Sequence, residues 1–243
     1  MTGAQEIGSP TSSLGRWVQG KHLLPEAVAG LRRRFEAQPE RYLVVDDFLL
    51  PERLARIREA VNRDGVMETA FKVYDSNDWV SRERFDETPD DRRFIYETIY
   101  AGPRPGQEMS PAVIEDALFR MEMGKPDFRG WLSAVTGLPA ERTGRINLKK
   151  LEQEHFLRWH NDRSPGRTLC LVLYLHAEWH PDLGGRLLMQ RQDGCVDALE
   201  PLFNRLILFD PCADALHAVE VMQGDWARLN YSAWFHRREN GGG

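Results

Sequence analysis

Two histidines and one aspartate stand at a spacing that could bind a metal ion. His160 and Asp162 are separated by one residue, and His217 follows later in the chain. Side chains two positions apart point the same way on a β-strand or at its end, so His160 and Asp162 can share one metal with an imidazole from a distant strand. This ligand set suits non-haem Fe(II), because it can occupy one face of an octahedron and leave the other positions for substrate and oxygen. By themselves the three residues also allow an ordinary structural role.

Short apolar segments surround these residues and predict the strands that must position them. A polar turn at 163–167 precedes an apolar strand at 168–175, and further strands are predicted at 186–191, 206–209, 218–222 and 227–235. Repeated short strands divided by Gly, Pro and Asp turns are typical of a sandwich or barrel.

The N-terminal half of the chain has helical patterns. Residues 1–15 are rich in Gly, Ser, Thr and Pro and predict a flexible tail. Helices are predicted at 24–35, 51–62, 110–121 and 126–136, with a short strand at 42–45. We therefore expect residues 16–243 to form one domain, mainly β with helices on the outside of the sheet (α+β).

The stretch 64–107 lacks a clear period and is dense in charged and aromatic residues. Such a long segment inside a compact domain is often a lid or a binding segment. A loosely packed flap is the alternative.

Composition restricts the classes of partner. The chain has 243 residues and a formal net charge of -5, which disfavours binding to nucleic acid. No apolar run approaches the roughly 20 residues that span a bilayer, and no signal pattern is evident, so we expect a cytoplasmic protein without a membrane partner. The three cysteines form no CxxC pair, which disfavours disulfides and a zinc site. The oligomeric state stays open.

From Leu151 to His236 the chain resembles the 2-oxoglutarate- and Fe(II)-dependent oxygenases, most closely their prolyl-hydroxylase-like branch. Seven motifs carry the resemblance in the order found in that family. They are His160-x-Asp162, Gly166-Arg167, Leu173-Tyr174-Leu175, Gly184-Gly185, the run 201–209, His217-x-Val219 and Arg228-x-x-x-Ser232-x-Trp234. The resemblance implies a double-stranded β-helix, or jelly-roll core, supported by the N-terminal helices, with iron inside its open end.

The resemblance also implies roles for single residues. His160, Asp162 and His217 would be the iron ligands, and Arg167 would face the substrate. Four residues would bind the cosubstrate: Arg228 would pair with the far carboxylate of 2-oxoglutarate, Tyr174 would donate to it, Ser232 would share the strand face of Arg228, and Trp234 would form the pocket wall. A guanidinium suits this role because its planar fork holds a carboxylate through two hydrogen bonds. Core packing is the alternative for Tyr174 and Trp234.

The implied reaction consumes 2-oxoglutarate and O2, releases succinate and CO2, and hydroxylates an unactivated C–H bond. Retention of Asp162 favours hydroxylation over halogenation. We expect a peptidyl or amino-acid-like substrate. The alternatives are a tailoring hydroxylase of a natural-product intermediate and a non-catalytic jelly-roll module that binds a small molecule or a protein.

The sequence also departs from the family. Leu151 stands where relatives commonly have a tyrosine, and Glu154-His155 replaces a Gly-Asp pair, so the substrate of those relatives is not carried over to this chain. We expect His155 to make a polar contact without binding metal. His176, His180 and His236 are predicted to lie at the surface.

Overall fold

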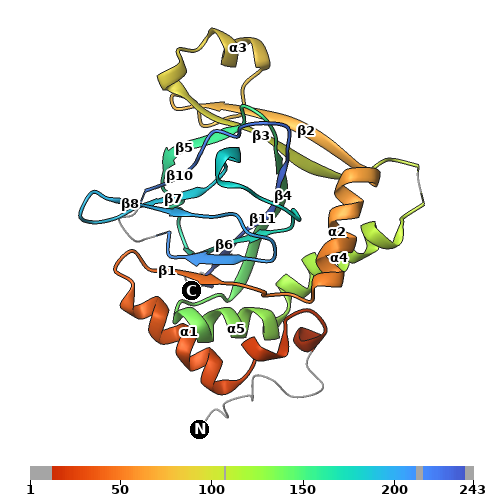
Figure 1. Cartoon of the computed structure of the whole chain (residues 1–243), viewed down its shortest axis with the longest axis vertical. Coiled ribbons are helices and arrows are strands. Elements are labelled where there is room, and N and C mark those ends of the chain that lie inside the picture. The colour runs from red at the N-terminus through yellow and green to blue at the C-terminus, as the bar shows by residue number, and fades with distance from the viewer. Residues whose placement is uncertain (1–12, 107, 212–215, 239–243) are drawn as a thin grey trace, which may run out of the picture.

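The centre of the molecule is an antiparallel sheet that curls into a jelly roll (Figure 1). The structure is a computed structural model, and it describes residues 13–106, 108–211 and 216–238. Hydrogen bonds connect the strands in the order β1-β9-β6-β11-β4-β3-β5-β10-β7-β8, and β2 pairs with β3. The strands are β1 Tyr42–Val45, β2 Gly65–Val73, β3 Arg93–Pro103, β4 Arg142–Leu151, β5 Phe156–His160, β6 Arg167–Tyr174, β7 Leu187–Gln190, β8 Val196–Leu199, β9 Leu206–Phe209, β10 His217–Val219 and β11 Arg228–His236. The predicted fold class is confirmed.

Strand β11 is buried on both faces, and its alternating side chains point into two different parts of the interior. Leu229, Tyr231 and Phe235 belong to the large apolar core that also includes the helices. Residues at the even positions, beginning with Arg228, line a cavity on the other face of the sheet. Because successive strand residues point to opposite faces, one strand supplies both the packing against the helices and the polar wall of the cavity.

The helices lie along the outside of the sheet (Figure 1). They are α1 Pro25–Ala37, α2 Pro51–Glu59, α3 Arg82–Glu87, α4 Pro111–Gly124 and α5 Pro126–Thr136, and a π-helical turn, η3 Ala60–Asp64, extends α2. Four of them begin with proline, whose fixed φ and missing N–H suit the first helical position. The helices of 24–35, 51–62, 110–121 and 126–136 are thereby confirmed to within a few residues. Among the described residues no helix is long and apolar enough to cross a bilayer.

Shorter 3-10 turns complete the described chain, and one of them corrects the predicted tail. They are η1 Ser13–Arg16, η2 Gly20–His22, η4 Asp90–Arg92 and η5 Pro181–Leu183. Leu14 is buried in the core beside the helices, so residues 13–15 are part of the fold. The burial of this one apolar side chain holds the segment against the core, although its composition is typical of a flexible tail. The prediction for 1–12 lies outside the described residues.

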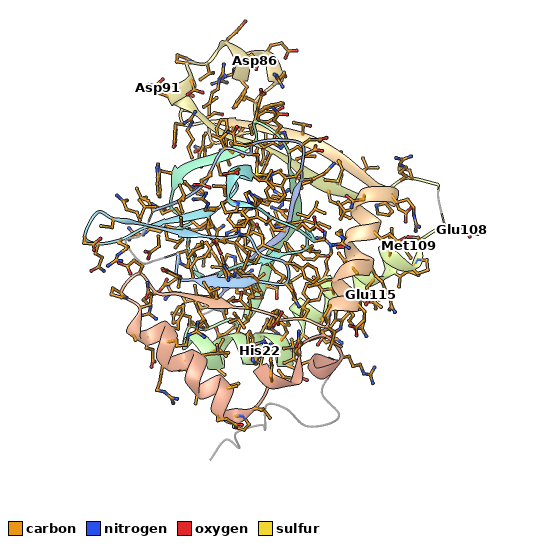
Figure 2. The ribbon with its side chains drawn as sticks, viewed as in Figure 1. His22, Asp86, Asp91, Glu108, Met109 and Glu115 are labelled. Atoms are coloured by element: carbon orange, nitrogen blue, oxygen red, sulfur yellow. The ribbon has the colours of Figure 1, made fainter. Side chains whose placement is uncertain are left out.

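The stretch 64–107 is more regular than its sequence indicates. It forms the long pair β2–β3, with α3 at the tip that stands away from the rest of the sheet (Figure 1). Asp86 and Asp91 project from this tip (Figure 2). Strand β3 also pairs with β4 and β5, so the base of the segment belongs to the jelly roll itself. A lid role therefore concerns only the part beyond these pairings.

Asn204 connects the turn before β9 with the segment that leads into α2. Its side chain accepts a hydrogen bond from the N–H of Leu49 at 2.8 Å and donates one to the C=O of Leu49 at 2.7 Å. Asn204 is 1% exposed and has a φ of 60°, a left-handed conformation that asparagine tolerates better than most residues. One side chain thus satisfies two backbone groups that are buried away from water.

We expect Asn204→Ala to destabilise the fold by about 2 to 4 kcal/mol, because the buried N–H of Leu49 loses its partner and alanine is strained at positive φ. The C=O of Leu49 keeps only the hydrogen bond from Gln19. Urea unfolding followed by circular dichroism measures the change. The exposed Asn62→Ala should change stability by less than about 0.5 kcal/mol. Equal effects of both substitutions would contradict the role of Asn204.

Candidate active site

The structure brings together the three residues of the predicted metal site. His160 ends β5 and is paired in register with His217 on β10, and their ring centroids are 4.2 Å apart. Asp162 follows β5 by two residues. One ligand atom from each of the three residues can be chosen so that all lie within 4.8 Å of one another. Strand pairing therefore fixes the two imidazoles side by side, and the carboxylate lies next to both.

Neighbouring groups orient these ligands. The Nδ1 of His160 lies 2.7 Å from the carbonyl oxygen of Arg158, which can only accept, so Nδ1 carries the proton and Nε2 faces the site. Trp234 donates from Nε1 to Asp162 Oδ2 at 2.9 Å. Arg167 donates to the carbonyl oxygen of Asp162 at 2.5 Å and stacks over Trp234. Such outer contacts are typical of metal sites, where they fix ligand geometry.

Burial and mutual charge set protonation states that suit metal binding. Burial lowers the pKa of His160 to about 4, and the neighbouring His217 adds to the shift, so the ring of His160 is neutral near pH 7. Burial opposes ionisation of Asp162, but His217, His160 and the Trp234 N–H outweigh it and lower the pKa of Asp162. A neutral imidazole and an ionised carboxylate are the forms that bind metal. The donor set therefore fits Fe(II).

A cavity of about 370 Å³ opens beside the triad. Phe94 from β3 packs edge-on against His160, with ring centroids 5.2 Å apart, and Tyr74 stacks on Phe94 at 4.9 Å. Trp79 also lines the cavity and is 47% exposed. The sequence analysis predicted a lid or binding segment in the aromatic stretch 64–107 but assigned no single aromatic residue to the site.

Arg228 lies inside the cavity and is 2% exposed. It donates to the phenolic oxygen of Tyr174 at 3.1 Å and to Asn230 Oδ1 at 3.0 Å. Its Nε has no hydrogen-bond partner, and no carboxylate among the described residues lies within 4.0 Å of its guanidinium. A buried charge without a counter-ion is costly, so this arrangement favours a bound anion.

The polar groups around Arg228 leave their protons available. Tyr174 accepts from Arg228, which frees its own O–H to donate. Asn230 Nδ2 donates to Ser232 Oγ at 3.0 Å, which leaves the hydroxyl proton of Ser232 free in the same way. Asn230 was missed by the sequence analysis, although its position on the strand face between Arg228 and Ser232 identifies it. Arg228 and Ser232 thus present hydrogen-bond donors to the cavity, and Tyr174 lies next to the guanidinium on the neighbouring strand.

Gly185 allows the chain to pass close to Arg228. Its φ is 74°, and an added Cβ would lie 2.7 Å from the sulfur of Met222 and 3.4 Å from Cδ of Arg228. A larger residue would displace the groups against which the arginine packs. The second glycine of Gly184-Gly185 therefore has a steric role beside the cavity.

The prediction that His176 lies at the surface is wrong. This side chain is 4% exposed, since its ring accepts a hydrogen bond from the N–H of Leu229 at 3.2 Å and its Nε2 contacts the carbonyl oxygen of Pro201. It is held between two backbone segments next to the start of β11. His180 is exposed, as predicted, and His236 is partly exposed. His155 makes the predicted polar contact, because its Nδ1 accepts from the N–H of Glu152 at 3.1 Å.

A buried ion pair forms another part of the cavity wall. Lys149 on β4 donates to Glu97 on β3 at 2.7 Å, and their side chains are 9% and 2% exposed. The sequence analysis assigned no role to either residue, because the pair forms between strands 52 positions apart in the chain. Both side chains line the cavity.

Comparison with known proteins agrees with this geometry. Residues 146–236 match the model of the 2OG-Fe(II) oxygenase superfamily. This C-terminal stretch therefore carries the sequence pattern of the superfamily. The chain is similar to the prolyl 3-hydroxylase OGFOD1 of Mus musculus, with 36% identity over 117 residues. This relative belongs to the prolyl-hydroxylase-like branch that the sequence motifs indicate. That match covers 45% of this chain and 22% of the relative, so the chain spans about a fifth of the length of the curated relatives it matches.

Solved structures share the fold. A prolyl-4-hydroxylase from Pseudomonas putida has a TM-score of 0.60 and 21% identity, with 87% of this chain and 100% of that chain covered. A Trichoplax adhaerens prolyl hydroxylase, solved with a peptide fragment of the hypoxia inducible factor, has a TM-score of 0.60 and 14% identity over 88% of this chain and 93% of that chain. The superfamily match implies Fe(II) and 2-oxoglutarate, in agreement with the predicted cofactor and cosubstrate and with the group of His160, Asp162 and His217. The individual roles of the site residues stay predictions.

We expect Trp234→Phe to weaken Fe(II) binding by about tenfold or more, because Asp162 loses the donor that orients its carboxylate. Anaerobic titration with Fe(II) measures the affinity. Trp159→Phe is the matched control, since the Trp159 side chain is 38% exposed and should leave the affinity unchanged. Wild-type affinity in Trp234→Phe would show that this contact does not support the metal site.

His176 should make the fold sensitive to acid. Burial lowers its pKa to about 4, against about 6.5 in an unfolded chain, so between these pH values the unfolded state binds a proton that the folded state lacks. Unfolding free energy should therefore fall, by on the order of 3 kcal/mol at most from this group, as pH drops from 6.5 to 4. In His176→Gln the fall should be smaller, as measured by urea unfolding across this pH range. His180→Gln is the control, because the exposed His180 should leave the acid-induced loss of unfolding free energy as large as in the wild type. An equal reduction of this loss in both variants would contradict the assignment to His176.

Proposed function

We propose that this protein is a 2-oxoglutarate-dependent hydroxylase that requires Fe(II). The observation that carries the proposal is the buried guanidinium of Arg228, which has no carboxylate partner among the described residues. It lies in the same cavity as the His160, Asp162 and His217 cluster. A non-catalytic jelly-roll module would have no need of a buried cation without a counter-ion beside three metal-binding side chains. The reaction would convert 2-oxoglutarate, O2 and R–H into succinate, CO2 and R–OH.

The residues of the cavity would divide the work. His160, Asp162 and His217 would hold Fe(II), which with 2-oxoglutarate supplies the chemistry that activates O2. Arg228 would hold the far carboxylate of 2-oxoglutarate through two charge-assisted hydrogen bonds.

The groups around these residues would support the cosubstrate and the metal ligands. Tyr174 and Ser232 would donate to the same carboxylate, and Asn230 would hold the guanidinium in place. Trp234 would act mainly on Asp162, to which it donates. Arg167 would be a positioning residue for the turn that carries Asp162 as well as the predicted substrate contact.

The shape of the cavity mouth supports a peptidyl or amino-acid-like substrate. Phe94 and Trp79 from the β2–β3 segment border the cavity, and such rings offer flat apolar faces to an extended chain or a saturated ring. The relatives with sequence or fold similarity include prolyl hydroxylases, one of them solved with a peptide fragment. The tip of the segment, beyond the pairing of β3 with β5, would act as the lid.

Succinate formation tests the proposed function. Protein freed of metal by a chelator and supplied with Fe(II), 2-oxoglutarate and O2 should form succinate, and a panel of free amino acids, proline-containing peptides and small metabolites should stimulate it. Mass spectrometry should then find one added oxygen atom in the active member of the panel. His160→Ala should fail to recover activity with Fe(II), because one ligand is lost. Tight Zn(II) binding without oxygen-dependent turnover, and wild-type behaviour of His160→Ala, would overturn the assignment.

Arg228→Ala should lower the affinity for 2-oxoglutarate by about tenfold to a hundredfold, because a charged hydrogen-bond pair contributes about 1.5 to 3 kcal/mol. Calorimetric titration of the Fe(II)-loaded protein without O2 measures this directly. Arg33→Ala on α1 is the matched control and should bind as the wild type does. Unchanged affinity in Arg228→Ala would place the carboxylate site elsewhere.

A further inference from the structure

The charged side chains that line the cavity are out of balance. The whole chain has a formal charge of -5, yet the described cavity wall carries five cationic side chains against two carboxylates. The cations are Lys72, Arg145, Lys149, Arg167 and Arg228, and the carboxylates are Glu97 and Asp162. The excess is therefore a property of this cavity and opposes the charge of the molecule as a whole.

Two of the cations already have partners inside the wall. Lys149 is paired with Glu97 at 2.7 Å, and Arg167 lies 3.6 Å from a carboxylate oxygen of Asp162. Arg228 is deep in the cavity and is the site proposed above for 2-oxoglutarate. Lys72 and Arg145 remain. In the part of the chain that the structure describes, neither lies within 4.0 Å of a carboxylate.

Both remaining cations line the same cavity as His160, Asp162 and His217. The ammonium of Lys72, on β2, is 5.9 Å from the ring centroid of Phe94, the same ring that packs against His160. Arg145 is exposed and lines the cavity on the same strand, β4, as Asn147 and Lys149. Arg145 thus continues the polar wall outward from the buried ion pair to the mouth.

Loading the site does not remove the excess. Fe(II) adds two positive charges and 2-oxoglutarate two negative ones, so within the described cavity wall Lys72 and Arg145 still have no counter-charge. Cations that line a cleft with low-dielectric walls concentrate anions there, and a guanidinium can hold a carboxylate through two hydrogen bonds. A cationic substrate would be repelled from the same mouth.

We propose that Lys72 and Arg145 form an anion subsite at the cavity mouth, and that the substrate carries a carboxylate close to the carbon that is hydroxylated. The inference rests on the proposed function and narrows its substrate to acidic peptides or acidic amino-acid-like molecules. The carboxylate comes from a side chain in a peptide or from a free small acid, and a binding experiment separates the two sources.

Three capped peptides of equal length test the subsite. Each is centred on proline, with flanking glutamate, glutamine or lysine residues. The α-amides of N-acetylglutamate and N-acetylglutamine represent the small free acid and its neutral match. Binding to the full chain loaded with Fe(II) and 2-oxoglutarate is measured by calorimetry without O2. We expect the acidic probe to bind at least about tenfold more tightly than its neutral match, with a preference that weakens as salt rises.

Variants of the two cations identify the groups responsible. Lys72→Gln and Arg145→Gln should each reduce the preference for the acidic probe by about threefold to fivefold, as expected of partly exposed ion pairs. Arg33→Gln, on α1, should keep it. The double variant Lys72→Glu/Arg145→Glu should prefer the lysine peptide, a reversal that a damaged fold cannot produce.

The outcomes separate the two proposals. If the wild type binds Fe(II) and 2-oxoglutarate but neither acidic probe binds more tightly than its neutral match, the anion subsite is wrong and the proposed function stands. If the preference exists but survives in both single variants and is not reversed in the double variant, it belongs to other residues and the subsite is wrong. If the wild type does not bind 2-oxoglutarate with Fe(II), the proposed function fails, and the substrate inference falls with it.

Discussion

A guanidinium buried inside a jelly roll is the constraint on which the rest of this structure depends. Arg228 starts a strand that is covered on both faces, so its charge cannot reach bulk water. The fold keeps it there through hydrogen bonds to Tyr174 and Asn230, through a histidine that holds the next backbone N–H, and through a glycine that leaves room for its side chain. These neighbours orient the charge without neutralising it, and a bound dicarboxylate would complete the arrangement.

The group of His160, Asp162 and His217 depends on a different feature, which is strand pairing between segments far apart in the sequence. His160 and His217 face each other because β5 and β10 are neighbours in register, and Asp162 is held by contacts from Trp234 and Arg167. Rigid backbone fixes the imidazoles and side-chain hydrogen bonds fix the carboxylate. This division suits a site that must present three ligands before the metal arrives.

The cavity has three electrostatic zones, and each follows from its surroundings. Near the metal cluster, burial keeps His160 neutral while its neighbours keep Asp162 ionised. Elsewhere in the cavity wall, Lys149 and Glu97 form an ion pair in which the two charges neutralise each other. At the mouth, Lys72 and Arg145 have no carboxylate partner among the residues that the structure describes. A net negative protein thus carries a positive entrance, which is the kind of local field that selects a ligand by charge.

The sequence by itself determined the parts with strong local signals. Periodicity and chain-breaking residues predicted the strands 42–45 and 206–209 and the four long helices. Motif order predicted the group of His160, Asp162 and His217, and an anion partner for Arg228. Strands β2, β3 and β4 were not, because one of their faces lines a polar cavity and carries Lys72, Glu97 and Lys149 where a buried strand would have apolar residues. Only the tertiary structure decided that Glu97 meets Lys149, that Phe94 packs on His160, and that His176 is buried. Such contacts join residues far apart in the chain, and no local pattern encodes which of many polar side chains will meet.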